Sequence, residues 1–154
     1  HGGSIRFYTR LNKYPKLNLI IKKFIQNETK FGLFKIQTYE EFCKKINLRK
    51  YLLLSKIIEL KKKKYKIICV GAAAKGNTFL NFHGLDNSLI DFVTDVSVHK
   101  VGKLTPISNI PIVKDDIFKN YNKVYALILS WNLKSTLEKK IIKINKRVKF
   151  LYYD

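Results

Sequence analysis

A short apolar run that leads directly into a turn of small residues constrains the fold of this chain most. The run Ile67–Val70 is followed by Gly71-Ala72-Ala73-Ala74-Lys75-Gly76-Asn77-Thr78. A buried strand, a glycine-bearing turn and a helix, in that order, are typical of an open α/β sheet whose turn backbone is approached by a ligand. We therefore predict a strand over 66–70 and a short helix over 78–83. Residues 71–78 are termed the glycine loop.

Strand-like and helix-like runs alternate through the rest of the chain. Strands are predicted over residues 90–94, 110–113, 124–129 and 149–153, with helical segments capped by Asp115 and by Asn132 between the later ones. Such alternation indicates a mostly parallel sheet with helices on both faces. The predicted fold class is therefore α/β, a three-layer domain, with its core over residues 65–154.

Two amphipathic segments precede this core. Apolar residues recur at helical spacing from Pro15 onward, and Thr38 is predicted to cap a long second helix that ends in four lysines at 61–64. Lysines at a helix C-terminus interact favourably with the helix dipole, so a solvated helix end explains this run. We expect residues 15–64 to form a helical lead-in, and residues 15–154 to form one domain.

The composition limits the class of protein. The 154 residues include no methionine, so we expect the chain to be a piece of a longer protein. No apolar run approaches the about 20 residues that span a bilayer, and no membrane association is predicted. Cys43 and Cys69 lack zinc-ligand spacing; both are predicted to be free, buried thiols in a reducing cytoplasm, and no metal site is predicted.

The net charge of +20 raises the question of nucleic-acid binding. Only four of the 31 basic residues are arginine, the side chain that binds phosphate and guanine through two parallel hydrogen bonds. The lysines are spread along the chain among many isoleucines and asparagines, as a genome rich in A and T would produce. A basic nucleic-acid-binding domain is therefore a disfavoured alternative.

The glycine loop partly matches two phosphate-binding motifs. Gly71, Gly76 and Thr78 have the spacing of a P-loop, but Asn77 occupies the position of its lysine, which argues against nucleotide hydrolysis. A dinucleotide-binding loop needs glycine at Ala73 for close approach of a pyrophosphate. Alternatively, the small residues only let a strand, a turn and a helix pack closely.

Further polar or aromatic residues follow the other predicted strands. Asp95, 19 residues beyond Gly76, lies near the place of a ribose-binding acid. His99 and Lys100 follow it in a loop, where they contact an anion or a sugar hydroxyl, or are simply exposed. Trp131 and Asn132 follow a later strand; the indole either stacks on a base or sugar or covers the core. In contrast, His83 has apolar neighbours and is predicted to pack in the core.

Four stretches together resemble a known family. They are His1-Gly2-Gly3-Ser4-Ile5-Arg6, the glycine loop, Asp95-Val96-Ser97-Val98-His99-Lys100-Val101-Gly102-Lys103 and Leu129-Ser130-Trp131-Asn132. These are similar to the C-terminal domain of S-adenosylmethionine-dependent C-methyltransferases, which methylate a carbon of nucleotide-linked deoxysugars. The resemblance covers essentially the whole chain, although the family commonly has proline at Ala73 or Ala74 and at Ser130.

The resemblance implies a Rossmann-like domain that helps to form the cleft for a nucleotide-sugar substrate. It implies that residues 1–14 are a linker after a missing methyltransferase domain, which would supply the catalytic base. S-adenosylmethionine and zinc are expected in the parent enzyme, and neither cofactor in this chain. The implied substrate-binding residues are Gly2, Gly3, Ser4, Arg6, Gly71, Lys75, Gly76, Asn77, Thr78, Asp95, His99, Lys100, Trp131 and Asn132.

The leading hypothesis is therefore the substrate-binding part of a sugar C-methyltransferase, inactive when isolated. A stand-alone nucleotide- or dinucleotide-binding module is the main alternative, and the alanine at position 73 counts against it.

Overall fold

The computed structural model describes residues 4–9, 11 and 18–153. The chain divides into two compact units, one over residues 1–48 and one over residues 49–154. Helix α2 (Ile36–Lys62) contributes residues to both. The predicted boundary between a lead-in and a core at residue 65 stays a prediction.

The first unit contains helix α1 (Leu19–Lys30), which begins where Asn18 caps it by accepting a hydrogen bond from the Ile20 amide at 2.9 Å. No described residue of α1 is buried. The predicted cap at Thr38 is wrong, because α2 already begins at Ile36. The Thr38 hydroxyl instead donates to the carbonyl of Gly32 at 2.8 Å and holds the turn between the two helices.

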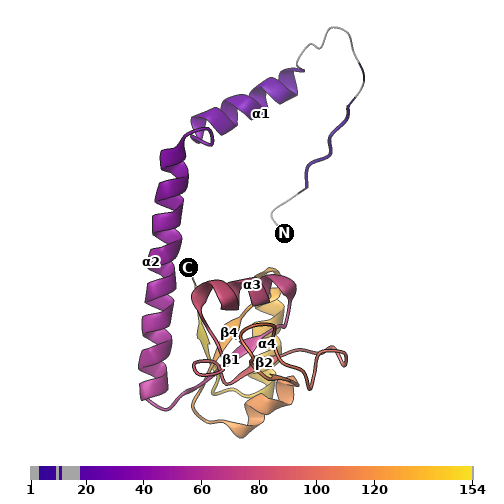
Figure 1. Cartoon of the computed structure of the whole chain (residues 1–154). Coiled ribbons are helices and arrows are strands. Elements are labelled where there is room, and N and C mark those ends of the chain that lie inside the picture. The colour runs from indigo at the N-terminus through magenta and orange to yellow at the C-terminus, as the bar shows by residue number, and fades with distance from the viewer. Residues whose placement is uncertain (1–3, 10, 12–17, 154) are drawn as a thin grey trace. The chain divides into compact units, whose positions relative to one another are not determined.

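The second unit is built on a five-stranded parallel sheet (Figure 1). The strands are β1 (Lys66–Val70), β2 (Phe92–Thr94), β3 (Ile112–Val113), β4 (Val124–Ile128) and β5 (Lys149–Leu151), in the spatial order β3-β2-β1-β4-β5. Every neighbouring pair is parallel. This order and orientation characterise a Rossmann-like fold and confirm the predicted fold class.

The connections between the strands differ from the prediction in their bounds. Helix α3 (Ala74–His83) begins within the glycine loop, four residues before the predicted start. The 3₁₀ helix η1 (Asp115–Asn120) follows Lys114, so Asp115 lies in its first turn and is not its cap. Asn132 is likewise inside the 3₁₀ helix η2 (Trp131–Leu133), which leads into α4 (Lys134–Ile144).

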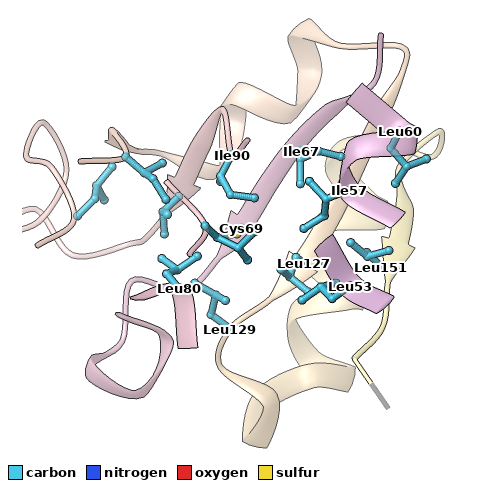
Figure 2. Close-up of a cluster of buried hydrophobic side chains, with 14 residues drawn as sticks. Leu53, Ile57, Leu60, Ile67, Cys69, Leu80, Ile90, Leu127, Leu129 and Leu151 are labelled. Atoms are coloured by element: carbon cyan, nitrogen blue, oxygen red, sulfur yellow. The ribbon is translucent and has the colours of Figure 1, made fainter. Parts of the chain in front are cut away.

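The two faces of the sheet are covered by different elements. On one face, Leu53, Ile57 and Leu60 of α2 pack with Leu80 of α3 against strand residues such as Ile67, Cys69, Leu127 and Leu151 (Figure 2). On the other face, Phe118 of η1 and Ile141 of α4 pack against Ile68, Val70 and Ala126. Successive β1 side chains alternate between these two clusters, as the period of a strand requires. The sheet is therefore the middle layer of three.

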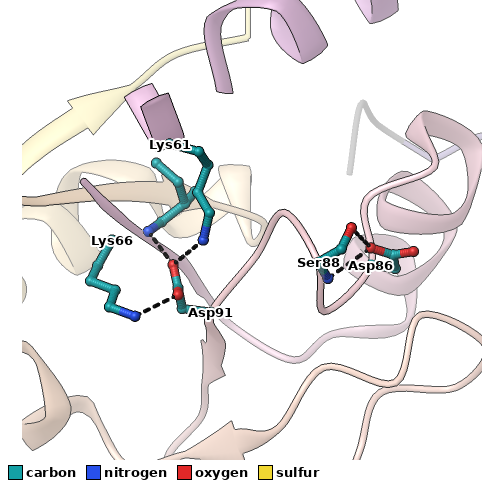
Figure 3. A network of polar contacts seen from close by, with 6 residues as sticks. Lys61, Lys66, Asp86, Ser88 and Asp91 are labelled. Carbon is teal, nitrogen blue, oxygen red and sulfur yellow. Dashed lines mark hydrogen bonds and ion pairs between the residues drawn. The ribbon is translucent and has the colours of Figure 1, made fainter. Parts of the chain in front are cut away.

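An ion-pair network closes the amino end of this sheet. Asp91 accepts hydrogen bonds from Lys61 at 3.1 Å, from Lys66 at 2.9 Å and from the Ile67 amide at 2.8 Å (Figure 3). Burial raises the pKa of Asp91, but these hydrogen bonds outweigh burial, so the pKa lies below its ordinary value. Asp91 thus joins the end of α2 to the start of β1.

The cysteines are both free, but only one is buried. Cys69 lies in β1 and is inaccessible, and burial raises the pKa of its thiol. The predicted burial of Cys43 is wrong, because its side chain is exposed on α2.

We therefore expect one thiol of the native chain to react quickly with a disulfide reagent and two to react after denaturation, as counted by absorbance. Two fast-reacting thiols in the native chain would contradict this packing.

Adjacent isoleucines on α2 test whether the end of this helix belongs to the core. Ile57 is fully buried, whereas Ile58 is 43% exposed. The substitution Ile57→Ala should lower the free energy of unfolding by about 2–5 kcal/mol, because it leaves a cavity between helix and sheet. The control Ile58→Ala removes the same atoms and should cost about 1 kcal/mol or less. Equal losses in urea titrations would show that α2 does not pack on the sheet as described.

Candidate functional site

The glycine loop is held close to the chain that follows β4. Gly71 has φ +95°, and a Cβ at this position would collide with Ser130 Oγ. A Cβ on Gly76 would lie 2.8 Å from Leu129 Cβ, closer than real Cβ contacts. Both glycines are therefore required where they stand, the first by its backbone conformation as well as by space. These contacts agree with close packing of the loop at Gly71 and Gly76, and the predicted substrate binding by both residues stays a prediction.

A partly buried carboxylate fixes the loop from its other side. Asp95 Oδ2 accepts a hydrogen bond from the Ala72 amide at 2.9 Å, and Oδ1 accepts one from the Ser97 amide at 2.9 Å. Lys100 Nζ lies 3.1 Å from the same carboxylate and donates to the Ala72 carbonyl at 2.9 Å. Asp95 and Lys100 therefore bind both backbone polar groups of Ala72, and we refer to this arrangement as the Ala72 clamp.

The Ala72 clamp also determines the charge state of Asp95. Burial raises the pKa of this carboxyl, but hydrogen bonds from the Ser97 amide and from Lys100 outweigh burial. The pKa therefore lies below its ordinary value, and Asp95 is ionised at neutral pH. The contacts that the structure gives Asp95 position the loop; its predicted contact with a substrate stays a prediction.

A pocket opens beside the clamp, at the carboxyl ends of β1 and β2. This loop pocket has a volume of about 280 Å³. It is lined by Ala72, Ala73, Asn77, Leu80, Val93, His99, Lys100, Lys103, Leu104, Thr105, Pro106, Ile112 and Leu129. Its position agrees with the rule that open α/β sheets bind ligands outside the carboxyl ends of their strands. Three of the predicted residues, Asn77, His99 and Lys100, meet here.

Asn77 is the residue in the loop pocket whose hydrogen bonding is incomplete. Its side-chain oxygen Oδ1 is buried and has no hydrogen-bond partner among the described residues. Because buried polar atoms are nearly always paired, such an atom beside a pocket indicates a place for a donor from a ligand. The amides of the first turn of α3 lie close by in sequence, and Ala73 provides no side-chain cap for them.

Trp131 lies in a different pocket. This second cavity, of about 240 Å³, is termed the aromatic pocket and is lined by Phe79, Leu127, Ile128, Leu129, Trp131, Lys134, Leu151, Tyr152 and Tyr153. Leu129 lines both pockets. The sequence correctly places the predicted residues after strand ends, but the structure separates Trp131 from His99 and Lys100.

The remaining predicted residues line neither pocket. Lys75 and Thr78 are exposed on α3, and Asn132 is exposed in η2. Ser4 and Arg6 are exposed in the first unit, where Arg6 Nη1 lies 3.5 Å from the Tyr8 hydroxyl. Gly2 and Gly3 lie outside the described residues. Substrate binding by all these residues stays a prediction.

His83 does not contribute to either pocket and packs as predicted. It is buried, its Nδ1 lies 2.8 Å from the Phe79 carbonyl oxygen, and its ring stacks on Phe79 with centroids 4.0 Å apart.

Sequence reasoning missed several lining residues. Lys103 and Thr105 form part of the loop pocket, and Phe79, Tyr152 and Tyr153 form part of the aromatic pocket. Lys103 is adjacent to Gly102, whose φ of +86° marks a turn that could have drawn attention to it. The two tyrosines belong to no sequence motif. They line the pocket because β5, which they follow, pairs with β4.

Within residues 4–9, 11 and 18–153, no three histidine, cysteine or acidic side chains gather as a metal site would require. The described helices also include none with the length and apolar character needed to cross a bilayer.

The parallel sheet, the glycine loop and the pockets at its carboxyl edge define a Rossmann-like α/β domain. The family described as the C-methyltransferase C-terminal domain matches residues 1–153, and the chain therefore belongs to that family. The resemblance found in the motifs is confirmed. C-methyltransferase NovU of Streptomyces niveus is 39% identical over 62 residues, which make up 40% of this chain and 15% of the relative.

Removing the charge of Asp95 tests the Ala72 clamp. Asp95→Asn should lower the free energy of unfolding near neutral pH by about 1.5–3 kcal/mol, because charge-assisted hydrogen bonds to the loop are lost. Since the folded-state pKa is depressed, the contribution is present above the unfolded pKa of about 3.9 and is lost as the pH falls through the folded value. The difference between the two proteins should therefore shrink in acid.

Asp116→Asn is the matched control, because Asp116 also pairs with a lysine but is largely exposed. Its effect in the same urea titrations should be small at every pH. A loss for Asp95→Asn that does not change with pH would mean that the carboxylate charge does not hold the loop.

Proposed function

We propose that this chain is the C-terminal, substrate-binding portion of an S-adenosylmethionine-dependent C-methyltransferase that acts on a nucleotide-linked sugar. The loop pocket would hold the phosphates and the adjoining sugar. The observation that carries this proposal is the combination, in one pocket at the sheet edge, of the basic Lys103 side chain with the unpaired Asn77 oxygen. Membership of the C-methyltransferase family supports the reaction class.

The chemistry of the loop pocket suits a phosphorylated sugar. Lys103 supplies positive charge, whereas the charge of Lys100 is already paired with Asp95. His99 adds a ring nitrogen that can donate a hydrogen bond. The uncapped amides at the start of α3 favour an anion for the same electrostatic reason. Asn77 Oδ1 is an acceptor, so it selects a ligand that also carries donors, such as the hydroxyl groups of a sugar.

We further propose that the methyl donor and the catalytic base belong to a methyltransferase domain outside this chain. Asp95, the acid at the end of β2, has its oxygens bound to the Ala72 and Ser97 amides and to Lys100, so it is poorly placed to receive the ribose of a cofactor. Zinc would also bind elsewhere in the parent protein. Alone, the chain would bind substrate without methylating it.

A stand-alone dinucleotide-binding module is the second candidate, because the strand order is that of dinucleotide-binding sheets. The hydrogen bonds that occupy Asp95 weigh against this candidate, because they leave its carboxylate poorly placed to bind the ribose of a dinucleotide. Saturable binding of NAD(H) that is tighter than binding of a nucleotide-sugar would favour this candidate.

Titration calorimetry with a thymidine-diphosphate sugar tests the leading proposal. Lys103→Gln and Asn77→Ala should each weaken binding about 5- to 20-fold, since each removes one polar contact with the ligand. Lys139→Gln is the matched control, because Lys139 is exposed on α4 and lines neither pocket. Absence of binding, or equal binding by all four proteins, would refute the assignment of the loop pocket.

A further inference from the structure

The aromatic pocket is a second cavity whose chemistry differs from that of the loop pocket. Its walls come from α3, from β4 and the residues after it, from α4, and from the residues at and beyond the end of β5. Four of its nine lining residues are aromatic and four are leucine or isoleucine, and Lys134 is the charged one. Such a lining favours an apolar, planar ligand over a phosphate or a sugar.

The size of the aromatic pocket limits what it can hold. Its volume of about 240 Å³ exceeds the about 150 Å³ of an engineered protein cavity that binds benzene. It is smaller than the roughly 300 Å³ at which pockets for drug-sized ligands begin. One aromatic ring system with a small substituent therefore fits, whereas a complete nucleotide-linked sugar does not.

Two aromatic side chains of this pocket keep large surfaces in contact with solvent. Trp131 is 51% exposed and Tyr152 is 50% exposed. Phe79 and Tyr153 are more deeply placed and hold each other edge to face, with ring centroids 5.0 Å apart. The inner rings are thus fixed by packing, while the exposed Trp131 ring offers a π face on which a planar ligand can stack.

Lys134 supplies the polar specificity of the pocket. Its Nζ lies 4.0 Å from the centroid of the Tyr152 ring, a cation–π contact that fixes the ammonium group at the pocket wall. No carboxylate among the described residues forms an ion pair with Lys134 within 4.0 Å. Its charge can therefore be neutralised by an anion on the ligand.

We propose that the aromatic pocket binds a planar aromatic ring that carries a negatively charged group. The ring stacks on Trp131, and the anion contacts Lys134, which the Tyr152 ring holds at the pocket wall. If the ring is the base of a nucleotide, this site rests on the proposed function; if it is an aromatic acid, the site lies beyond that function. The same chemistry has two sources, namely the base of a nucleotide with its phosphate and an aromatic carboxylic acid.

Trp131 gives this proposal a direct readout, because it is the sole tryptophan of the chain. Its fluorescence, excited at the red edge of the tryptophan band, should be quenched saturably by thymidine monophosphate or by 4-hydroxyphenylacetate. Inorganic phosphate and ribose 5-phosphate carry the anion without the ring and should leave the fluorescence unchanged. Free N-acetyltryptophanamide corrects for light absorbed by the ligands.

Three variants locate the ligand while keeping Trp131 as the probe. Tyr152→Ala and Lys134→Gln should each weaken binding of the quenching ligand about 3- to 10-fold. The first removes the ring that holds the Lys134 ammonium group in place, and the second removes its charge. Lys139→Gln, on the same helix but outside the pocket, should match the unchanged chain. Circular dichroism of each variant confirms that it is folded, so that a loss of binding reports on the pocket.

The two ligand arms separate the sources. Saturable quenching by the nucleotide identifies a base subsite, and quenching by the aromatic acid alone identifies a separate ligand. A ligand concentration of about 1 mM still detects a binding free energy of about −4 kcal/mol. If neither ring compound quenches saturably at that concentration, the proposal is overturned. Equal quenching in all three variants would overturn it as well. Both results are independent of the calorimetry on the loop pocket, because they leave Lys103 and Asn77 unchanged.

Discussion

The geometry of the sheet edge depends on the hydrogen bonds that Asp95 and Lys100 make to Ala72. This residue lies in the turn after β1, and both of its backbone polar groups are bound by side chains that follow β2. Gly71 and Gly76 in turn lie against Ser130 and Leu129, which follow β4. The glycine loop is therefore held by residues that follow both neighbours of the central strand, and Leu129 also lines both pockets.

This arrangement explains why the loop does not match either phosphate-binding motif. The two glycines are needed because the chain after β4 comes within contact distance of the loop. Asp95 stands where a dinucleotide-binding sheet has an acid for a ribose, but here its carboxylate is bound to protein amides and to Lys100. Residue types familiar from cofactor binding thus support the loop itself, whereas Asn77, His99 and Lys103 line the loop pocket.

Much of the fold follows from the sequence. The strands at 66–70 and 124–128 were predicted almost to the residue, because each is a continuous apolar run buried on both faces. The helix starts at Thr38, Asp115 and Asn132 were predicted wrongly, since capping residue types also serve in turns and first helical turns. The exposure of Cys43 was missed because helical periodicity does not show whether a helix face is covered, and no described residue of the first unit is buried.

The candidate site was predicted in part, for a similar reason. The sequence shows which residues follow strands, and a parallel sheet brings all strand ends to one edge. It does not show that this edge carries two separate pockets, one at the ends of β1 and β2 and one beside the ends of β4 and β5. Trp131 was therefore grouped with His99 and Lys100. Tyr152 and Tyr153 could not be found at all, because only the pairing of β5 with β4 brings them beside Trp131.

Leu129 has a consequence for how this domain can diversify. Its side chain lines both cavities, and its Cβ sets the distance of closest approach to Gly76. A change of side-chain size at this single position therefore alters the volumes of both cavities together. Evolution at Leu129 cannot enlarge one cavity while leaving the other as it is.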